Sequence, residues 1–216
     1  MQPEVVRARA FSYACHACGR CCHDKRITLS PYEIARIAEA TGATTRAVLE
    51  RHTDEGGTVL RFDAHGCTFL HARARASCAA HAGRPLACRL YPLGRIVDST
   101  GQEVFVHVEP HPQSEGVHGE AGTIASWIEA QGAQPFIDAA EKYAVLARRL
   151  FDRLNDAEGG AAAFRDAVTT ETSVASDWLD VDAVVARTCA DRGVEVPGEL
   201  EARIAIHLCE LEAWIG

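Results

Sequence analysis

The sequence lacks any long hydrophobic run. No stretch approaches the roughly 20 apolar residues that a membrane-spanning helix needs, and residues 1–14 contain no apolar core like that of a signal peptide. These absences predict a cytoplasmic protein with no membrane partner. Aromatic residues make up only 6% of the chain and the basic residues are scattered, so nucleic acid is not an expected partner.

Two motifs of cofactor-dependent enzymes are also missing. No glycine-rich fingerprint for an adenosyl or dinucleotide cofactor follows a predicted strand. The Cys-x3-Cys-x2-Cys arrangement of radical-initiating clusters is absent, because Lys25 stands where a cysteine would be needed after Cys18 and Cys22. These absences count against an enzyme that binds an adenosyl or dinucleotide cofactor and against a radical enzyme. Whether the protein is an enzyme of another kind stays open.

Cysteine, by contrast, is abundant. Seven of the nine cysteines lie in the first 88 residues. Four of them fall within eight positions, at Cys15, Cys18, Cys21 and Cys22. In a reducing compartment, clustered cysteines are more often metal ligands than disulfides, so we predict metal ligation, with disulfides as the alternative. The remaining two, Cys189 and Cys209, lie on predicted helices and are expected in the core.

The Cys-x2-Cys-x2-Cys spacing of this run suits two kinds of metal centre. Such a loop gives three thiolates to an iron–sulfur cluster, and the Cys-x2-Cys spacing also serves tetrahedral zinc. Gly19 allows the sharp turn that the loop needs. Consecutive side chains should diverge, so we expect Cys21 and Cys22 to serve two neighbouring centres or to leave one thiol outside. We favour an iron–sulfur cluster, such as 4Fe-4S, over zinc.

Charge is distributed unevenly along the chain. Residues 1–95 hold 14 Lys and Arg against 8 Asp and Glu, whereas residues 96–216 hold 8 against 22. A basic half that is rich in cysteine would stabilise a negatively charged thiolate site. We favour the simpler interpretation that the two halves compensate each other's charge.

The hydrophobic pattern predicts a mostly helical α+β fold. A capping box at Ser30, followed by Pro31, predicts a helix that ends at Gly42, and Thr44 or Thr45 should cap a second helix. Strands are expected at residues 58–62 and 103–109, and further helices over residues 123–154, after residue 180 and over residues 198–214.

We expect two domains. Residues 1–157 would form a loop-rich cysteine-cluster metal-binding domain with a small β element, in which helices 123–154 pack over the metal region. Residues 158–216 would form a helical extension, joined through Glu158-Gly159-Gly160. A length of 216 residues suits one ordinary domain with such an appendix.

Several motifs together resemble one family. They are Cys15-x2-Cys18-Gly19-x-Cys21-Cys22, Cys67-x-Phe69-Leu70, Cys78, and Arg84-Pro85-x2-Cys88-Arg89-x-Tyr91-Pro92. Over about residues 11–132 the chain resembles the CxxCxxCC zinc- or iron-chelating family, a cysteine-cluster domain also found in flagellin lysine N-methylases. The resemblance implies a set of about eight cysteines that bind metal.

This chain departs from the family pattern after Cys88. Where the family usually supplies another cysteine, the sequence has Pro110-His111-Pro112. Imidazole is a competent metal ligand, so His111 is our candidate for the eighth donor. The predicted metal ligands are Cys15, Cys18, Cys21, Cys22, Cys67, Cys78, Cys88 and His111. The other histidines near cysteines are weaker candidates, expected to hydrogen-bond to sulfur or solvent: His16, His23, His65, His71 and His81, with His81 the best reserve.

Arg84, Arg89 and Tyr91 are the candidate cofactor-binding residues. A guanidinium can donate hydrogen bonds to thiolate or sulfide and offset the negative charge of a cluster. We favour this supporting role over direct substrate contact, and Arg84 is the candidate for contacting an anionic substrate.

The sequence therefore predicts a metal-binding protein in which seven cysteines and one histidine hold an iron–sulfur cluster or two metal ions. One alternative is a cluster-dependent enzyme, either resembling a protein lysine N-methyltransferase or catalysing a redox reaction. A second alternative is a zinc-stapled helical adaptor whose acidic C-terminal helices dock a protein partner.

Overall fold

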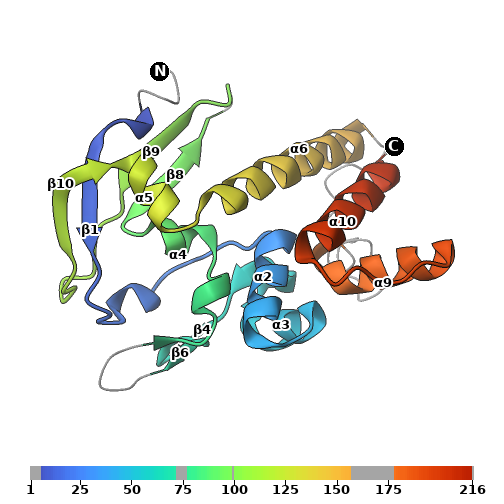
Figure 1. Ribbon diagram of the computed structural model, residues 1–216, viewed down its shortest axis with the longest axis horizontal. Helices are drawn as coiled ribbons and strands as arrows, with labels where there is room; N and C mark the ends of the chain where they lie inside the picture. Colours follow the sequence, from blue (N-terminus) through green and yellow to red (C-terminus); the bar gives the residue numbers. More distant parts are fainter. Residues whose placement is uncertain (1–5, 72–76, 99, 157–177, 216) are drawn as a thin grey trace. The chain divides into compact units, whose positions relative to one another are not determined.

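The computed structural model describes residues 6–71, 77–98, 100–156 and 178–215. The predicted class, mostly helical α+β, is confirmed. The α-helices are α2 (Pro31–Thr41), α3 (Thr45–His52), α4 (Leu86–Leu90), α5 (Ile124–Ala130), α6 (Gln134–Asp156), α9 (Val181–Arg192) and α10 (Leu200–Ile215) (Figure 1). Short 3-10 helices are η1 (Arg20–Cys22), η2 (Glu55–Gly57) and η3 (His81–Gly83).

The strands of the described residues form antiparallel pairs and no larger sheet. The two longest pairs are β1 (Ala10–Ala14) with β10 (Val117–Thr123), and β8 (Leu93–Val97) with β9 (Glu103–His107). The others are two-residue pairs: β2 (Thr53–Asp54) with β3 (Val59–Leu60), β4 (Phe62–Asp63) with β5 (Gly66–Cys67), and β6 (Leu70–His71) with β7 (Ser77–Cys78). Each β element is therefore small, as expected, but such strand pairs occur at several places along the described chain.

The chain divides into two compact units that interleave in sequence. Met1–Ile27 and Phe62–Ile137 form one, which we name the cysteine unit, and Thr28–Arg61 and Asp138–Gly216 form the other, the helical unit. The predicted domain boundary at residue 157 and the predicted linker at residues 158–160 lie outside the described residues. None of the helices in the described part of the chain is both long and apolar enough to cross a membrane.

A hydrophobic core organises the cysteine unit. Its buried residues come from β1, α4, β8, β9, α5 and the start of α6: Phe11, Leu90, Leu93, Phe105, Ile124, Ile128, Ala133 and Ile137, together with Val6. Trp127 packs against this core and donates an indole hydrogen bond to the Leu90 carbonyl at 3.1 Å. Helix α5 begins at a Thr123 cap, within the range where the sequence predicted helices, and the chain turns at Gly132 with φ of +56°. This core fixes the strands and the short helix between which the cysteine loops run.

Local sequence signals account for the helices of the helical unit. Ser30 and Glu33 form the predicted capping box of α2, which ends at Gly42 with φ of +68°. Thr44 caps α3, and Asp180 caps α9. The Thr45 hydroxyl also donates to the buried Asp180 carboxylate at 2.5 Å, which joins two helices that are far apart in sequence.

Two sequence expectations were wrong in detail. The predicted strand at residues 58–62 is divided, because β3 pairs with β2 whereas β4 pairs with β5, and Arg61 lies between them. Cys189 is buried as expected, but Cys209 is exposed. On α10 the buried face is formed by Ile204, His207, Leu211 and Ile215, three or four residues apart, and Cys209 falls off that spacing.

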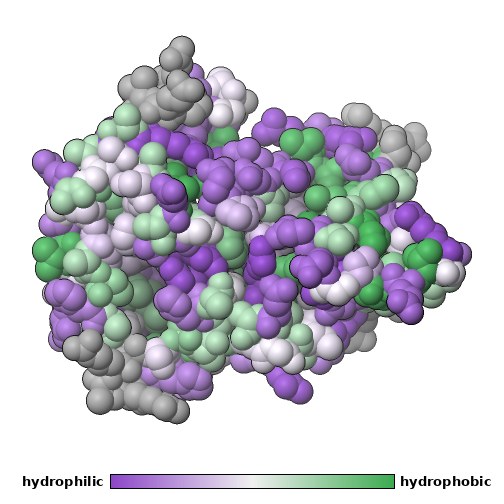
Figure 2. Space-filling model, viewed as in Figure 1, coloured by the Kyte–Doolittle hydropathy of each residue, from purple (hydrophilic) through white to green (hydrophobic). Residues whose placement is uncertain are grey.

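The surface of the helical unit mixes hydrophobic and hydrophilic side chains (Figure 2). Val145 on α6 is 60% exposed, and Val194 and Val196 after α9 are also exposed. Exposed apolar residues of this kind are ordinary on a protein surface.

Candidate metal centre

The seven clustered cysteines all lie in the cysteine unit, on four segments. Cys15 and Cys18 follow β1, and Cys21 and Cys22 lie in η1. The other three are placed one each on β5 (Cys67), β7 (Cys78) and α4 (Cys88). Cys15 and Cys88 are exposed, and the others are half-buried. The cysteines are free thiols in this structure.

The thiols on these segments influence one another electrostatically. The hydrogen bond with Cys21 and burial raise the pKa of the Cys22 thiol, and negative charge on Cys88 and Cys67 raises it further. Burial raises the pKa of Cys67, and the charges of Cys78 and Cys21 add to that rise. Burial likewise raises the pKa of Cys78, again with a contribution from Cys21. Because Coulomb interactions weaken with distance, thiols that shift one another's pKa share one neighbourhood.

The thiols of Cys21 and Cys22 do not diverge, contrary to the expectation from sequence. Their Sγ atoms are 4.0 Å apart. Gly19 takes a left-handed conformation with φ of +72°, and the Cys22 N–H donates to the Gly19 carbonyl at 3.0 Å, which curls the chain into η1. Two ligands of one tetrahedral zinc ion, each about 2.3 Å from the metal, are roughly 3.8 Å apart. The two adjacent thiols are therefore spaced to share one ion.

The thiols converge without forming a closed coordination shell. No three His, Cys, Asp or Glu side chains in the described ranges are grouped closely enough to hold a metal ion. Metal binding would therefore draw the cysteine loops together. The order of these loops would then depend on the bound metal.

Backbone amides donate to sulfur at three of the clustered cysteines. The sulfur accepts a hydrogen bond from the N–H two residues later: Ala17 to Cys15 at 3.4 Å, Phe69 to Cys67, and Ala80 to Cys78. At Cys67 and Cys78 this hydrogen bond opposes the rise in pKa that burial causes, because an N–H donor stabilises the negative charge of a thiolate. The same local turn thus recurs on three separate cysteine segments.

Gly66 allows β5 to lie close to η1. Its φ is +108°, and a Cβ at this position would lie 2.8 Å from the Cys22 carbonyl oxygen and 3.0 Å from the His23 ring. Only glycine, which has no Cβ, can take this conformation so close to the Cys22 carbonyl. The glycine immediately before Cys67 therefore brings that cysteine against the Cys21–Cys22 turn.

Replacing Gly66 with alanine should destabilise the protein by about 2–4 kcal/mol, because backbone strain is joined by a collision with the Cys22 carbonyl. Gly101→Ala is the matched control, since Gly101 also has a positive φ of +81° but nothing within 4 Å of the added Cβ. It should cost about 1 kcal/mol. Urea unfolding of the full chain measures both, and equal losses would contradict the proposed close contact.

Arg89 stabilises the loop before α4 through hydrogen bonds to backbone carbonyls. Its buried guanidinium donates to the carbonyls of Arg84 at 3.1 Å, Gln131 at 2.8 Å and Ala82. It also lies over the Phe136 ring, 4.1 Å from the centroid. These contacts tie the loop to the end of α5, and the expected role of Arg89 beside thiolate or sulfide stays a prediction.

Arg84 is the cation beside the thiols. Burial lowers the pKa of its guanidinium, and negative charge on Cys88, Cys78 and Cys15 acts in the opposite direction. It donates to the His81 carbonyl at 2.9 Å and to the Gln131 side chain at 2.7 Å. Arg84 is thus positioned to offset thiolate charge.

Two tyrosines flank the cysteine run. Tyr91 and Tyr13 meet edge to face, with their ring centroids 6.0 Å apart. Burial raises the pKa of both phenols, and charge on Cys21 and Cys18 raises it further. Tyr91 was among the predicted site residues, whereas Tyr13 was missed because its strand pairs with residues more than a hundred positions later.

His111 is held within its own loop. Its Nδ1 accepts a hydrogen bond from the Gln113 N–H at 3.1 Å, and its carbonyl accepts from the Ser114 N–H. Ligation by His111 stays a prediction. Ligation through Nε2 would require the neutral ring to shift its proton, because a ring whose Nδ1 accepts carries its proton on Nε2.

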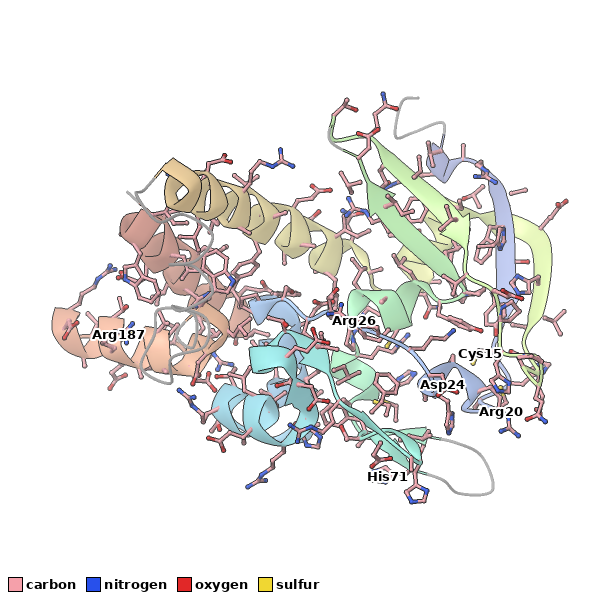
Figure 3. The ribbon with its side chains drawn as sticks, turned by 180° about the vertical axis from the view of Figure 1, so that it is seen from behind. Cys15, Arg20, Asp24, Arg26, His71 and Arg187 are labelled. Atoms are coloured by element: carbon pink, nitrogen blue, oxygen red, sulfur yellow. The ribbon has the colours of Figure 1, made fainter. Side chains whose placement is uncertain are left out.

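The remaining neighbours of the cysteines differ in position. Cys15, Arg20 and Asp24 lie together where β1 passes into η1, whereas His71 on β6 points away from them (Figure 3). His23 and Lys25 were underestimated from sequence: the charges of both lower the pKa of Cys21. Their position directly after the cysteine run was the feature of the sequence that could have identified them.

Cys21 is the thiol expected to react first in the metal-free protein. A hydrogen bond from the Cys22 thiol, aided by the charges of Lys25 and His23, lowers the pKa of Cys21 to about 7 against the effect of burial. The same hydrogen bond raises the pKa of Cys22. Because thiolate is the nucleophile, iodoacetamide should alkylate Cys21 at a rate that rises with pH through about 7. Peptide mapping across a pH series measures this, and faster alkylation of Cys22 would contradict it.

These features define a thiol-rich domain suited to chelating a soft or borderline metal. Residues 14–110 match the family model CxxCxxCC, described as "Putative zinc- or iron-chelating domain". The resemblance predicted from the cysteine spacing is thereby confirmed over this segment, which contains all seven clustered cysteines and ends one residue before His111. No curated protein and no solved structure was found to match the chain.

Proposed function

We propose that the cysteine unit binds zinc or iron through its clustered thiols. The proposed ligands are Cys15, Cys18, Cys21, Cys22, Cys67, Cys78 and Cys88. The observation that carries the proposal is that separate cysteine segments meet: the Cys21 and Cys22 sulfurs are 4.0 Å apart, and Gly66, directly before Cys67, lies against the Cys22 carbonyl. The electrostatic influence of Cys21 on Cys67 and Cys78 agrees with this. The match to a zinc- or iron-chelating family supports the same chemistry.

The spacing of adjacent thiols favours single ions over a cluster. The 4.0 Å separation of the Cys21 and Cys22 sulfurs is close to the edge of a tetrahedral thiolate site, roughly 3.8 Å. We therefore propose that both bind the same four-coordinate zinc or iron ion. A 4Fe-4S cluster is the second candidate, because Cys15, Cys18 and Cys21 keep the spacing of cluster-binding loops.

Positive charge near the sulfurs would reduce the electrostatic repulsion between the thiolates of such a site. Four thiolates around a divalent ion carry a net charge of about −2. Arg84 couples to Cys15, Cys78 and Cys88, and Lys25 to Cys21. These side chains would lower the cost of gathering negative charge in one place.

Anaerobic purification followed by elemental and sulfide analysis tests the proposal. If the site holds single ions, we expect about one or two zinc or iron ions per chain and no acid-labile sulfide. Each ion needs four ligands, so the ligand set suffices for one or two ions. Iron with sulfide and visible absorption would select the cluster. A metal-free protein that takes up neither zinc nor iron when these are supplied anaerobically would refute metal binding.

A further inference from the structure

We propose that His23 supplies the imidazole ligand of the metal site, in the place that the sequence pattern suggested for His111. The inference rests on the proposed metal binding and adds one named donor to it. Three observations carry it: the proton position on the ring, the place of the ring between two cysteine segments, and the contrast with His111.

The hydrogen bond of His23 fixes its tautomer. Nδ1 lies 3.1 Å from the Gly19 carbonyl oxygen. A carbonyl can only accept, so Nδ1 carries the proton, and the lone pair of the neutral ring is on Nε2. Metal-binding histidines commonly donate one ring N–H to a backbone carbonyl while the other nitrogen binds the metal. His23 therefore already has the tautomer that coordination through Nε2 requires.

The backbone explains how the ring reaches this position. His23 follows η1 directly and is extended, with φ of −124° and ψ of 150°. This conformation ends the 3-10 helix, and the ring returns to the Gly19 carbonyl at the start of that turn. The imidazole is thus held by the same turn that places Cys21 and Cys22.

The edge of the ring that bears Nε2 faces the segment of Cys67. A Cβ built on Gly66 would lie 3.0 Å from both Cδ2 and Nε2 of His23. On the other side, His23 directly follows Cys22, and its ring is held at the Gly19 carbonyl of the same turn. Nε2 therefore lies beside the chain that delivers Cys67, and the ring belongs to the turn that carries Cys21 and Cys22; these are the segments that a shared ion would join.

His111 has the opposite arrangement. Its Nδ1 accepts from the Gln113 N–H, so the Nε2 of the neutral ring carries the proton. It also lies just outside the segment that matches the chelating family, whereas His23 lies inside it. With His23, the seven thiols make a set of eight donors, enough for two four-coordinate ions.

Cobalt and zinc binding by the full chain tests the assignment. Zinc affinity is measured by competition with a chromophoric chelator, and the cobalt(II) spectrum reports the number of sulfur and nitrogen ligands. His23→Ala and His23→Asn should each weaken zinc binding at least about tenfold and shift the cobalt bands. The asparagine amide nitrogen is bonded to Cγ as Nδ1 is, so it can still donate to the Gly19 carbonyl, and the variant removes the ligand while preserving the turn.

A replacement ligand separates coordination from a structural role. His23→Cys should restore zinc affinity relative to His23→Ala and move the cobalt spectrum towards an all-sulfur pattern, since thiolate is a zinc ligand. His111→Ala is the matched control and should change neither property. Unchanged spectra and affinities in the His23 variants, or a shift found only in His111→Ala, would overturn the assignment. A wild-type chain that binds neither metal would instead refute the proposed function itself.

Discussion

Cys22→Ser is expected to lower metal affinity by about 100-fold or more. Structural zinc sites contribute roughly 10–16 kcal/mol of binding free energy, so the loss of one of four ligands removes roughly 3 kcal/mol. Cys22 is the sensitive position because it lies 4.0 Å from the Cys21 sulfur and is coupled to both Cys67 and Cys88. Serine keeps the size of the side chain and replaces the sulfur with a hydroxyl, which is not among the usual zinc ligands.

Competition titration with a chelator measures this loss, and metal content after gel filtration confirms it. Cys209→Ser is the matched control, because that thiol is exposed on α10 in the helical unit. The control should bind metal like the parent, and both variants should keep their far-ultraviolet circular dichroism. Equal affinity of Cys22→Ser and Cys209→Ser would show that Cys22 is not a ligand.

Chelation is expected to release the cysteine loops while the C-terminal helices persist. In the described part of residues 62–89, the buried apolar side chains are only Phe69, Ala80 and Pro85, and strands β4 to β7 have two residues each. Segments with so few buried contacts depend on another source of order. Metal at 1,000 times its Kd would stabilise the bound state by about 4 kcal/mol, which corresponds to about a 1,000-fold change in amide exchange if opening is coupled to release.

Hydrogen exchange with and without chelator measures this directly. Amides from Cys78 to Leu90 should exchange faster after chelation, whereas those of α9 and α10 in the helical unit should keep their protection and provide the internal control. Equal protection of residues 78–90 in both states would contradict the metal-dependent order of the loops.

Local signals allowed the helices to be predicted from sequence. The capping box at Ser30 and the glycine at Gly42 define α2 through contacts within a few residues, and the structure reproduces both. A helix was also expected to start at residue 123, where Thr123 caps α5. These elements need no information from distant parts of the chain.

Long-range pairing could not be predicted in the same way. Strand β1 pairs with β10, where Tyr13 lies opposite His118, and neither segment shows a clear alternation of apolar and polar residues. The contact between Thr45 and Asp180 likewise joins two helices without any shared local motif. For the same reason, the grouping of Thr28–Arg61 with the C-terminal half was not foreseen.

The candidate site was predictable as a set of cysteines but not as an arrangement. The spacing identified the thiols, because metal loops need closely spaced ligands. It misjudged the direction of the Cys21 and Cys22 side chains, which depends on the left-handed Gly19 and the 3-10 turn. The choice between His111 and His23 also could not be argued from sequence, because the proton position on each ring is decided by a backbone hydrogen bond that the sequence does not display.

X-ray absorption at the metal edge of the anaerobically purified full chain tests the central claim most directly. The thiol site predicts sulfur neighbours at about 2.3 Å as the dominant scatterers, with a minor nitrogen contribution at about 2.0–2.1 Å from the imidazole. A metal surrounded only by oxygen and nitrogen at the shorter distance would show that the converging cysteines are not its ligands.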